Sequence, residues 1–191
     1  NLSGAVEEAF VDGFVIKASD VKLYGINITG NISTSSGNGN ITIERCKTRG
    51  ISFYNAGTNL KVINCYVAGN VSGDDRGAQV RNSIVLGQVS NINNGIIRNC
   101  VIISDCGNST SPYYYDYVLT SIKNTSITNN IIINTNTASK VDGNTTVYFN
   151  HQTIYNTSET DANSINNNIL STDAEHSFDI YKSNYFIGAT I

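Results

Sequence analysis

β-branched apolar residues recur along the chain directly after a small polar unit, in which an Asn precedes a small or thiol-bearing residue. The unit occurs seven times, with Arg in place of Asn in the first copy: Arg45-Cys46, Asn64-Cys65, Asn82-Ser83, Asn99-Cys100, Asn124-Thr125, Asn150-His151 and Asn166-Asn167. Its second positions are 19, 18, 17, 25, 26 and 16 residues apart. This period is too short for helix-pair repeats and is typical of one coil of a β-solenoid.

Each coil of this length would hold about three short strands. Coils would stack ~4.8 Å apart, so that equivalent residues form columns along the axis. A column of Asn has a physical reason, because stacked amides can donate to one another and to the turn backbone. The alternative is that Asn is simply abundant here. We therefore predict a single all-β domain over residues 1–191, a β-solenoid of about eight coils.

Three segments carry a resemblance to a known fold: "GFVIKASDVKLYGINITG", "LKVINCYVAGNV" and "GIIRNCVIIS". They resemble coils of the pectate-lyase-like superfamily over roughly residues 12 to 187. The resemblance implies a single-stranded right-handed parallel β-helix. It is unspecific for function, because that superfamily includes lyases, glycosidases, phage tailspikes and non-catalytic adhesins.

The composition favours β-strands and argues against two classes of protein, nucleic-acid-binding and membrane-spanning. Charged residues make up 14% of the chain and hydrophobic residues 40%, and 16 residues are Gly. Asn, Ser, Thr and Gly disfavour helix interiors, whereas Val, Ile, Thr and Tyr suit strands. A net charge of −3 without a basic tract argues against a nucleic-acid partner. No apolar run approaches the ~20 residues of a membrane-spanning helix.

The same composition is similar to that of secreted and cell-surface proteins. We therefore expect an extracellular or cell-surface location. The chain begins at Asn1 and contains no Met, from which we expect a piece of a longer protein with neighbouring domains.

Three cysteines share one repeat position with other small residues: Cys46, Cys65 and Cys100, alongside Ser83 and Thr125. They are interpreted as small side chains stacked inside the coil, and a Cys46–Cys65 bridge between adjacent coils is the alternative. The fourth cysteine, Cys106, has no C-x2-C partner. No metal site is predicted.

A cluster of aromatic residues around one carboxylate is the most unusual local feature. It comprises Tyr113, Tyr114, Tyr115, Asp116 and Tyr117 and lies in a long coil. Tyrosine offers a flat apolar face and a polar tip, which suits stacking on sugar rings. The alternative is that some of these tyrosines pack over the coil as a lid. The cluster is our first candidate for ligand contact.

A basic residue precedes the repeat unit in three successive coils, at Arg81, Arg98 and Lys123. Stacked like charges repel, so this column implies acidic neighbours or an anionic ligand such as a uronic-acid polymer. Pairing with Asp74, Asp75 or Asp105 is the alternative. Arg81 and Arg98 are the second candidates for ligand contact.

Catalytic candidates are few. A β-helical lyase would need carboxylates holding Ca²⁺ and a nearby base, and a hydrolase would need paired carboxylates. The nearest match is Asp74-Asp75 in "SGDDRG", with Arg98 or Lys123 assisting. Turns favour Asp for local hydrogen bonding, so this signal is weak. The Gly-His-Gly and Arg-x-Lys motifs of polygalacturonase-like enzymes do not occur.

Three functions remain open from the sequence. The preferred one is a non-catalytic, adhesin-like extracellular module that recognises a polysaccharide or surface glycan and needs no cofactor. The second is a polysaccharide lyase or glycoside hydrolase of the β-helix superfamily, with Ca²⁺ required in the lyase case. The third is a purely structural stalk.

Overall fold

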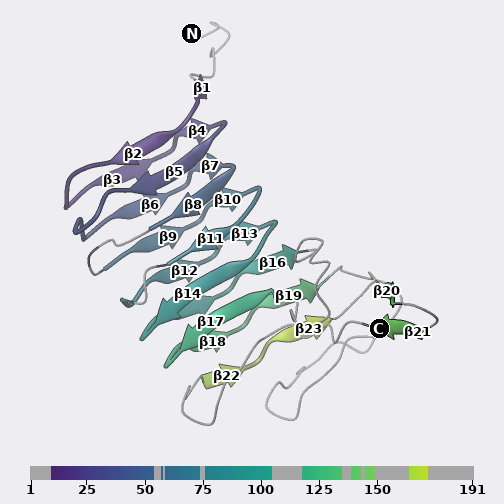
Figure 1. Cartoon of the computed structure of the whole chain (residues 1–191). Helices are drawn as coiled ribbons and strands as arrows, with labels where there is room; N and C mark the ends of the chain where they lie inside the picture. The colour runs from purple at the N-terminus through teal and green to yellow at the C-terminus, as the bar shows by residue number, and fades with distance from the viewer. Residues whose placement is uncertain are drawn as a thin grey trace, which may run out of the picture.

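The computed structural model of the chain describes residues 10–53, 57, 59–73, 76–104, 118–134, 139–142, 145–148 and 164–171. Within these ranges every regular element is a β-strand, and the strands wind into stacked coils (Figure 1). The expected all-β parallel β-solenoid is therefore confirmed. No helix in the described ranges is long and apolar enough to cross a membrane.

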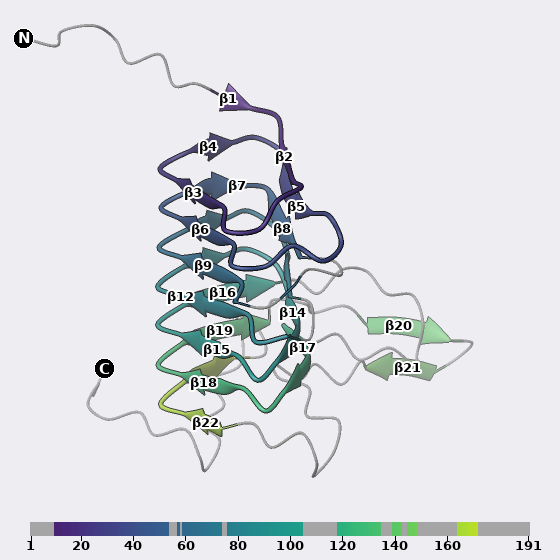
Figure 2. The same ribbon diagram turned by 90° about the vertical axis from the view of Figure 1, so that its left-hand side faces the viewer.

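Three parallel sheets run along the solenoid (Figure 2). The eight-stranded sheet consists of β1 (Phe10–Val11), β4 (Asn27–Ile28), β7 (Lys47–Thr48), β10 (Tyr66–Val67), β13 (Ile84–Val85), β16 (Val101–Ser104), β19 (Ile131–Asn134) and β23 (Ile169–Ser171). The six-stranded sheet consists of β2 (Phe14–Ile16), β5 (Asn31–Thr34), β8 (Gly50–Ser52), β11 (Val71–Ser72), β14 (Val89–Asn93) and β17 (Leu119–Lys123). The seven-stranded sheet consists of β3 (Lys22–Tyr24), β6 (Thr42–Glu44), β9 (Lys61–Ile63), β12 (Gln79–Arg81), β15 (Ile96–Arg98), β18 (Ser126–Thr128) and β22 (Ser164–Asn166).

Equivalent residues of successive coils lie side by side and build the core. In the seven-stranded sheet Val80 of β12 pairs with Val62 of β9 on one side and with Ile97 of β15 on the other. These middle residues are buried, whereas both neighbours in each strand are more exposed. Successive side chains of a strand point to opposite faces, so the core is a set of stacked aliphatic columns.

The chain turns between sheets through residues in the left-handed conformation. We call the turn from the seven-stranded to the eight-stranded sheet the seven-to-eight corner, and the turn from the six-stranded to the seven-stranded sheet the six-to-seven corner. At the seven-to-eight corner φ is between 49° and 68° at Gly25, Arg45, Asn64, Asn82, Asn99, Asn129 and Asn167. At the six-to-seven corner φ is between 46° and 83° at Asp20, Asn40, Asn59, Gly77, Asn94 and Asn124. Asn and Asp adopt this conformation more readily than other residues with a Cβ. Asn therefore recurs because most coils have two such corners.

The positions of these corners show that the expected Asn ladder was wrong at two of its copies. Asn124 belongs to the six-to-seven corner, and the seven-to-eight corner of that coil is formed by Asn129. The last copy is shifted by one residue, because Asn166 lies in β22 and Asn167 forms the corner. Both corners use the same residue types, so the sequence repeat mixed two columns. Asn150-His151 lies outside the described residues.

Asparagine side chains do hydrogen-bond between coils, as expected. On the surface, Asn99 Nδ2 donates to Asn82 Oδ1 at 3.1 Å. In the interior, Asn130 Nδ2 donates to Asn168 Oδ1 at 2.9 Å. Asn130 and Asn168 are buried and continue the column that Cys100 occupies one coil earlier. The buried ladder thus lies one residue after the corner residue, at the end of the solenoid nearer the C-terminus.

Two coils are lengthened by insertions that leave from adjacent positions. They follow β16 and β19, whose last residues Ser104 and Asn134 pair with each other. The second insertion contains an antiparallel hairpin of β20 (Ser139–Asp142) and β21 (Thr145–Tyr148). In the described part of the chain these two strands pair only with each other.

Candidate functional site

The outer faces of the three sheets differ in chemistry. The eight-stranded sheet and its edge expose large apolar side chains: Tyr66, Ile84, Leu86 and Ile131. The seven-stranded sheet carries the charged residues of β3, β6, β9, β12 and β15. The six-stranded sheet presents mainly small hydroxyl side chains. Of the three, the six-stranded face carries the concavity described next.

A groove of about 690 Å³ crosses strands β5, β8 and β11. Its lining consists of Asn31, Ser33, Arg49, Gly50, Ile51, Ser52, Ala68, Gly69, Asn70 and Ser72. The groove therefore spans three successive coils on the outer face of the six-stranded sheet. A surface of this shape runs along the solenoid axis and suits an extended ligand.

A column of hydroxyl groups forms the floor of this groove. Ser52 pairs with Ser33 on one side and with Ser72 on the other. The column continues through Ser90 to Thr120 beyond the groove. Each of these residues follows a buried aliphatic residue, so the alternation of the strand turns the hydroxyl outward.

Glycines keep the groove open beside the serine column. A Cβ on Gly50 would lie 3.0 Å from Asn31 Oδ1 and 3.4 Å from the Asn70 carbonyl oxygen. A Cβ on Gly69 would lie 2.6 Å from the Arg49 carbonyl oxygen, closer than real Cβ atoms approach. Only glycine at position 69 lets two coils approach this closely. The groove wall between Asn31 and Asn70 is consequently bare of side chains.

The lining offers hydrogen-bonding groups and one positive charge. Hydroxyls both donate and accept, amides supply two donors and an acceptor, and the Arg49 guanidinium supplies donors only. Asn70 Oδ1 already accepts a bond from the backbone N–H of Gln88 at 2.9 Å, which fixes the orientation of the Asn70 side-chain amide. No carboxylate or imidazole is among the lining residues. This set can bind polyhydroxylated molecules without supplying an acid or a base.

The sequence contains a signal for this groove that is separate from the Asn repeat. Three-residue units end in Ser at similar intervals: Asn31-Ile32-Ser33, Gly50-Ile51-Ser52, Asn70-Val71-Ser72 and Gln88-Val89-Ser90. An Asn before a small residue marks a corner between sheets. The Ser units report an outward-facing strand column instead.

The expected basic column is only partly formed. Arg81 pairs directly with Arg98 in the seven-stranded sheet. Lys123 does not follow them, because it pairs with Asn93 in the six-stranded sheet, while Thr128 is the next neighbour of Arg98. The expectation for Lys123 was wrong because it rested on the misplaced Asn124 corner.

The other predicted site residues lie outside the described residues. These are the tyrosine cluster and the candidate carboxylates: Tyr113, Tyr114, Tyr115, Asp116, Tyr117, Asp74, Asp75 and Asp105. Their roles in ligand contact or catalysis stay predictions. Among the described residues, no group of three His, Cys, Asp or Glu side chains could hold a metal ion.

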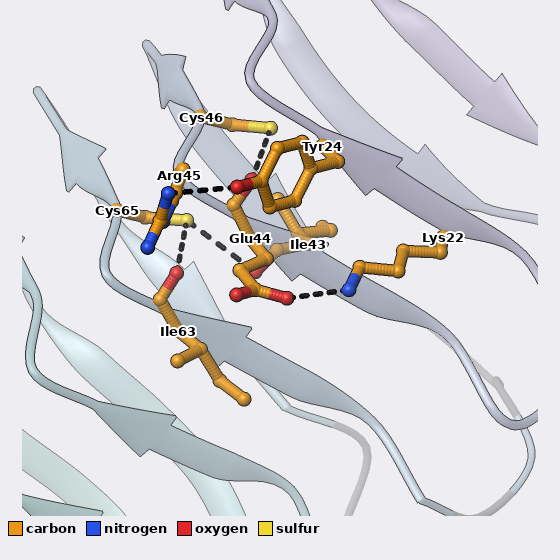
Figure 3. A network of polar contacts seen from close by, with 8 residues as sticks. All are labelled: Lys22, Tyr24, Ile43, Glu44, Arg45, Cys46, Ile63 and Cys65. Carbon is orange, nitrogen blue, oxygen red and sulfur yellow. Dashed lines mark hydrogen bonds and ion pairs between the residues drawn. The ribbon is translucent and has the colours of Figure 1, made fainter.

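Paired charges occupy the first coils of the seven-stranded face (Figure 3). Lys22 Nζ lies 2.7 Å from Glu44 Oε2. In the same network the Arg45 guanidinium donates to the Tyr24 hydroxyl at 2.8 Å and lies over its ring. Figure 3 also shows Cys46 and Cys65 stacked behind this surface, in adjacent coils. These charges have partners, whereas Arg81 and Arg98 have no ion-pair partner within the part of the chain that the structure describes.

The cysteines of the repeat are interior packing residues. Cys46, Cys65 and Cys100 are buried free thiols, as the small-residue interpretation predicts, and Cys106 lies outside the described residues. Burial raises the pKa of the Cys65 and Cys100 thiols from 9.0 to about 11. Each Sγ also contacts a backbone carbonyl oxygen, Ile63 for Cys65 and Arg98 for Cys100, at 3.2 Å. Thiols in such surroundings are poor nucleophiles.

We expect these two thiols to resist a disulfide-exchange reagent at pH 8 in the native protein. At three pH units below the pKa only about one thiol in a thousand is ionised, and burial blocks access. A Cys106→Ser variant leaves only the three buried cysteines, Cys46, Cys65 and Cys100, in the assay. Absorbance should report thiols only after denaturant is added, and prompt labelling of the native variant would contradict the buried column.

Comparison with known proteins leaves the family undecided. No protein-family profile matches the chain, and neither a curated protein nor a solved structure matches it. The parallel β-solenoid rests on the strand pairing itself. The pectate-lyase-like superfamily stays a prediction from the repeats.

Proposed function

We propose that this chain is a non-catalytic, extracellular β-solenoid module that recognises carbohydrate, in the manner of an adhesin. The observation that carries the proposal is the groove on the six-stranded sheet, with its floor of stacked serines. A polysaccharide is an extended chain of repeating units. The groove offers it a repeating set of hydroxyls along three coils.

The chemistry of the groove fits sugar hydroxyls in particular. Ser33, Ser52 and Ser72 repeat at the strand spacing of ~4.8 Å. A hydroxyl can serve as donor or acceptor, and Ser72 Oγ already accepts a bond from Asn91 Nδ2 at 3.1 Å. Asn31 and Asn70 flank the floor with amide groups. Side chains on a rigid sheet lose little conformational freedom on binding, which favours affinity from many weak contacts.

The low density of charge supports the same proposal. Twelve Lys and Arg and 15 Asp and Glu are spread over 191 residues, and Arg49 is the one charged residue that lines the groove. Neutral polysaccharides are therefore the first ligands to test.

The test uses binding of soluble neutral polysaccharides to the full chain, measured by calorimetry together with chromatography of the incubated glycan. We expect binding without product formation. Ser52→Val should weaken binding about tenfold or more, because a sugar hydroxyl then loses its partner and faces a methyl group. Valine suits a strand, so the solenoid should remain folded.

Thr120→Val is the matched control. Thr120 occupies the same column two coils beyond the groove, so this nearly isosteric change should leave affinity within twofold. Equal losses in both variants, or binding that Ser52→Val does not alter, would place the ligand elsewhere. A shortened or unsaturated product would support the enzyme alternative, and no binding to any glycan would support a stalk.

A further inference from the structure

Three consecutive strands of the seven-stranded sheet present cations on their outer face and carry no carboxylate themselves. The outward residues of β9, β12 and β15 are Lys61, Ile63, Gln79, Arg81, Ile96 and Arg98. Arg81 and Arg98 pair directly, at the ~4.8 Å spacing of adjacent strands. The six positions thus hold three positive charges and no carboxylate. We call Lys61, Arg81 and Arg98 the cationic patch.

None of the three cations has an ion-pair partner among the described residues. The one ion pair there joins Lys22 to Glu44, so that the carboxylate nearest to Lys61 along the sheet is already engaged. The strand neighbours of the two arginines are Ile63 and Thr128, both uncharged. Like charges directly opposite one another in a sheet destabilise it. Among the described residues, the patch therefore has no free counter-charge.

The guanidinium of Arg81 is also partly withdrawn from water. Its Nε is buried and has no hydrogen-bond partner. Partial desolvation makes a charged group depend more strongly on a nearby opposite charge. Unsatisfied polar groups in a folded protein are uncommon, and each calls for a physical explanation.

The cationic patch is positive, whereas the chain as a whole is negative. The chain carries a net charge of −3, so long-range attraction of polyanions is weak and any binding depends on local donors. Guanidinium groups match carboxylate and sulfate oxygens through two parallel hydrogen bonds. Two stacked guanidinium groups with a lysine one coil away offer such donors along the solenoid axis.

We propose that the cationic patch binds the oxyanion groups of an acidic polysaccharide, either sulfate or carboxylate. Arg81 and Arg98 hold the oxyanion between them, and Lys61 attracts the next charge along the polymer. This site lies on a different sheet from the serine-floored groove and does not depend on it. The low overall number of basic residues favours a polysaccharide over a nucleic acid, which would need many more phosphate contacts.

The test compares three polymers that share one backbone: dextran, carboxymethyl-dextran and dextran sulfate. Binding to the full chain is measured at constant ionic strength. We expect at least one charged polymer to bind tenfold or more tightly than dextran, and the stronger of the two identifies carboxylate or sulfate. Arg81→Gln with Arg98→Gln should remove that tenfold preference. Arg81→Lys with Arg98→Lys should keep part of it, because the charge remains while the paired hydrogen bonds are lost.

Lys47→Gln is the control, since it removes one positive charge from the eight-stranded face and should change affinity less than twofold.

A second experiment measures the melting temperature in sodium sulfate and in sodium chloride of equal ionic strength. Sulfate should raise the melting temperature of the natural chain more than that of the double Gln variant. Four results would overturn the proposal: unchanged binding by the double Gln variant, an equal loss with Lys47→Gln, tighter binding of duplex DNA, or a melting temperature that falls when Arg98 alone becomes Gln. The last would mean that acidic residues already neutralise the pair.

Discussion

Replacing Asn130 by alanine should lower the free energy of unfolding by about 3 kcal/mol, because one buried amide serves three partners. Asn130 Oδ1 accepts a hydrogen bond from the backbone N–H of Cys100 at 2.8 Å. Its Nδ2 donates to the Ile97 carbonyl oxygen at 3.0 Å and to Asn168 Oδ1 at 2.9 Å. Alanine would leave the Cys100 N–H in the core without a partner. Urea unfolding followed by circular dichroism measures the loss.

Asn130→Ser separates the hydrogen bonds from simple packing. In the same column Ser83 accepts a bond from the Cys65 amide nitrogen at 3.1 Å and donates to the Arg81 carbonyl oxygen at 2.7 Å. Serine at 130 can repeat that arrangement, so we expect a loss of only about 1 kcal/mol. Equal losses for alanine and serine would show that the amide ladder contributes little to stability.

Gly95→Ala should also lower the free energy of unfolding by about 3 kcal/mol. Replacing a glycine of ordinary φ by alanine normally stabilises a protein, so this loss would be unusual. Gly95 lies at the six-to-seven corner, one residue after Asn94. A Cβ there would overlap the Ala78 carbonyl oxygen of the preceding coil and the Ile92 side chain. The backbone atom belongs to an adjacent coil and cannot move without shifting the stack. The melting temperature of the purified variant measures the effect.

Two other glycines provide controls for this comparison. At Gly50 the nearest atom to an added Cβ is the Asn31 side-chain oxygen at 3.0 Å, which can rotate away, so Gly50→Ala should be nearly neutral. At Gly37 the space is open but φ is +83°, so Gly37→Ala should lose about 1 kcal/mol through backbone strain alone. If Gly95→Ala costs no more than Gly37→Ala, the close coil contact at position 95 is not rigid.

The two proposed surfaces divide the molecule into faces of different chemistry. The groove on the six-stranded sheet offers hydroxyls and amides, and the cationic patch on the seven-stranded sheet offers guanidinium groups. Both follow the solenoid axis, because parallel in-register coils place equivalent residues beside one another. A repeating ligand is the natural partner of either surface.

Part of the site could be read from the sequence. The pairing of Arg81 with Arg98 was predicted, since both precede a genuine seven-to-eight corner, at Asn82 and Asn99. Lys123 was assigned to the same column because Asn124 has the same chemistry as those corner residues. Its true neighbour Asn93 lies in a different sheet. The serine column was overlooked although its members recur at coil spacing.

The sequence alone determined the class of fold and the interior use of cysteine, because both follow from local rules. Left-handed corners favour Asn, and strands favour β-branched residues. The shared interior position holds Cys or Ser in four successive coils and Asn in the coils nearer the C-terminus. The tertiary structure alone decided which corner each Asn forms and which side chains share a face. Two corners of one coil need the same residue types, so only the pairing of strands between coils distinguishes them. That pairing reduced the expected basic column to the Arg81–Arg98 pair and revealed a hydroxyl-lined groove on a neighbouring sheet.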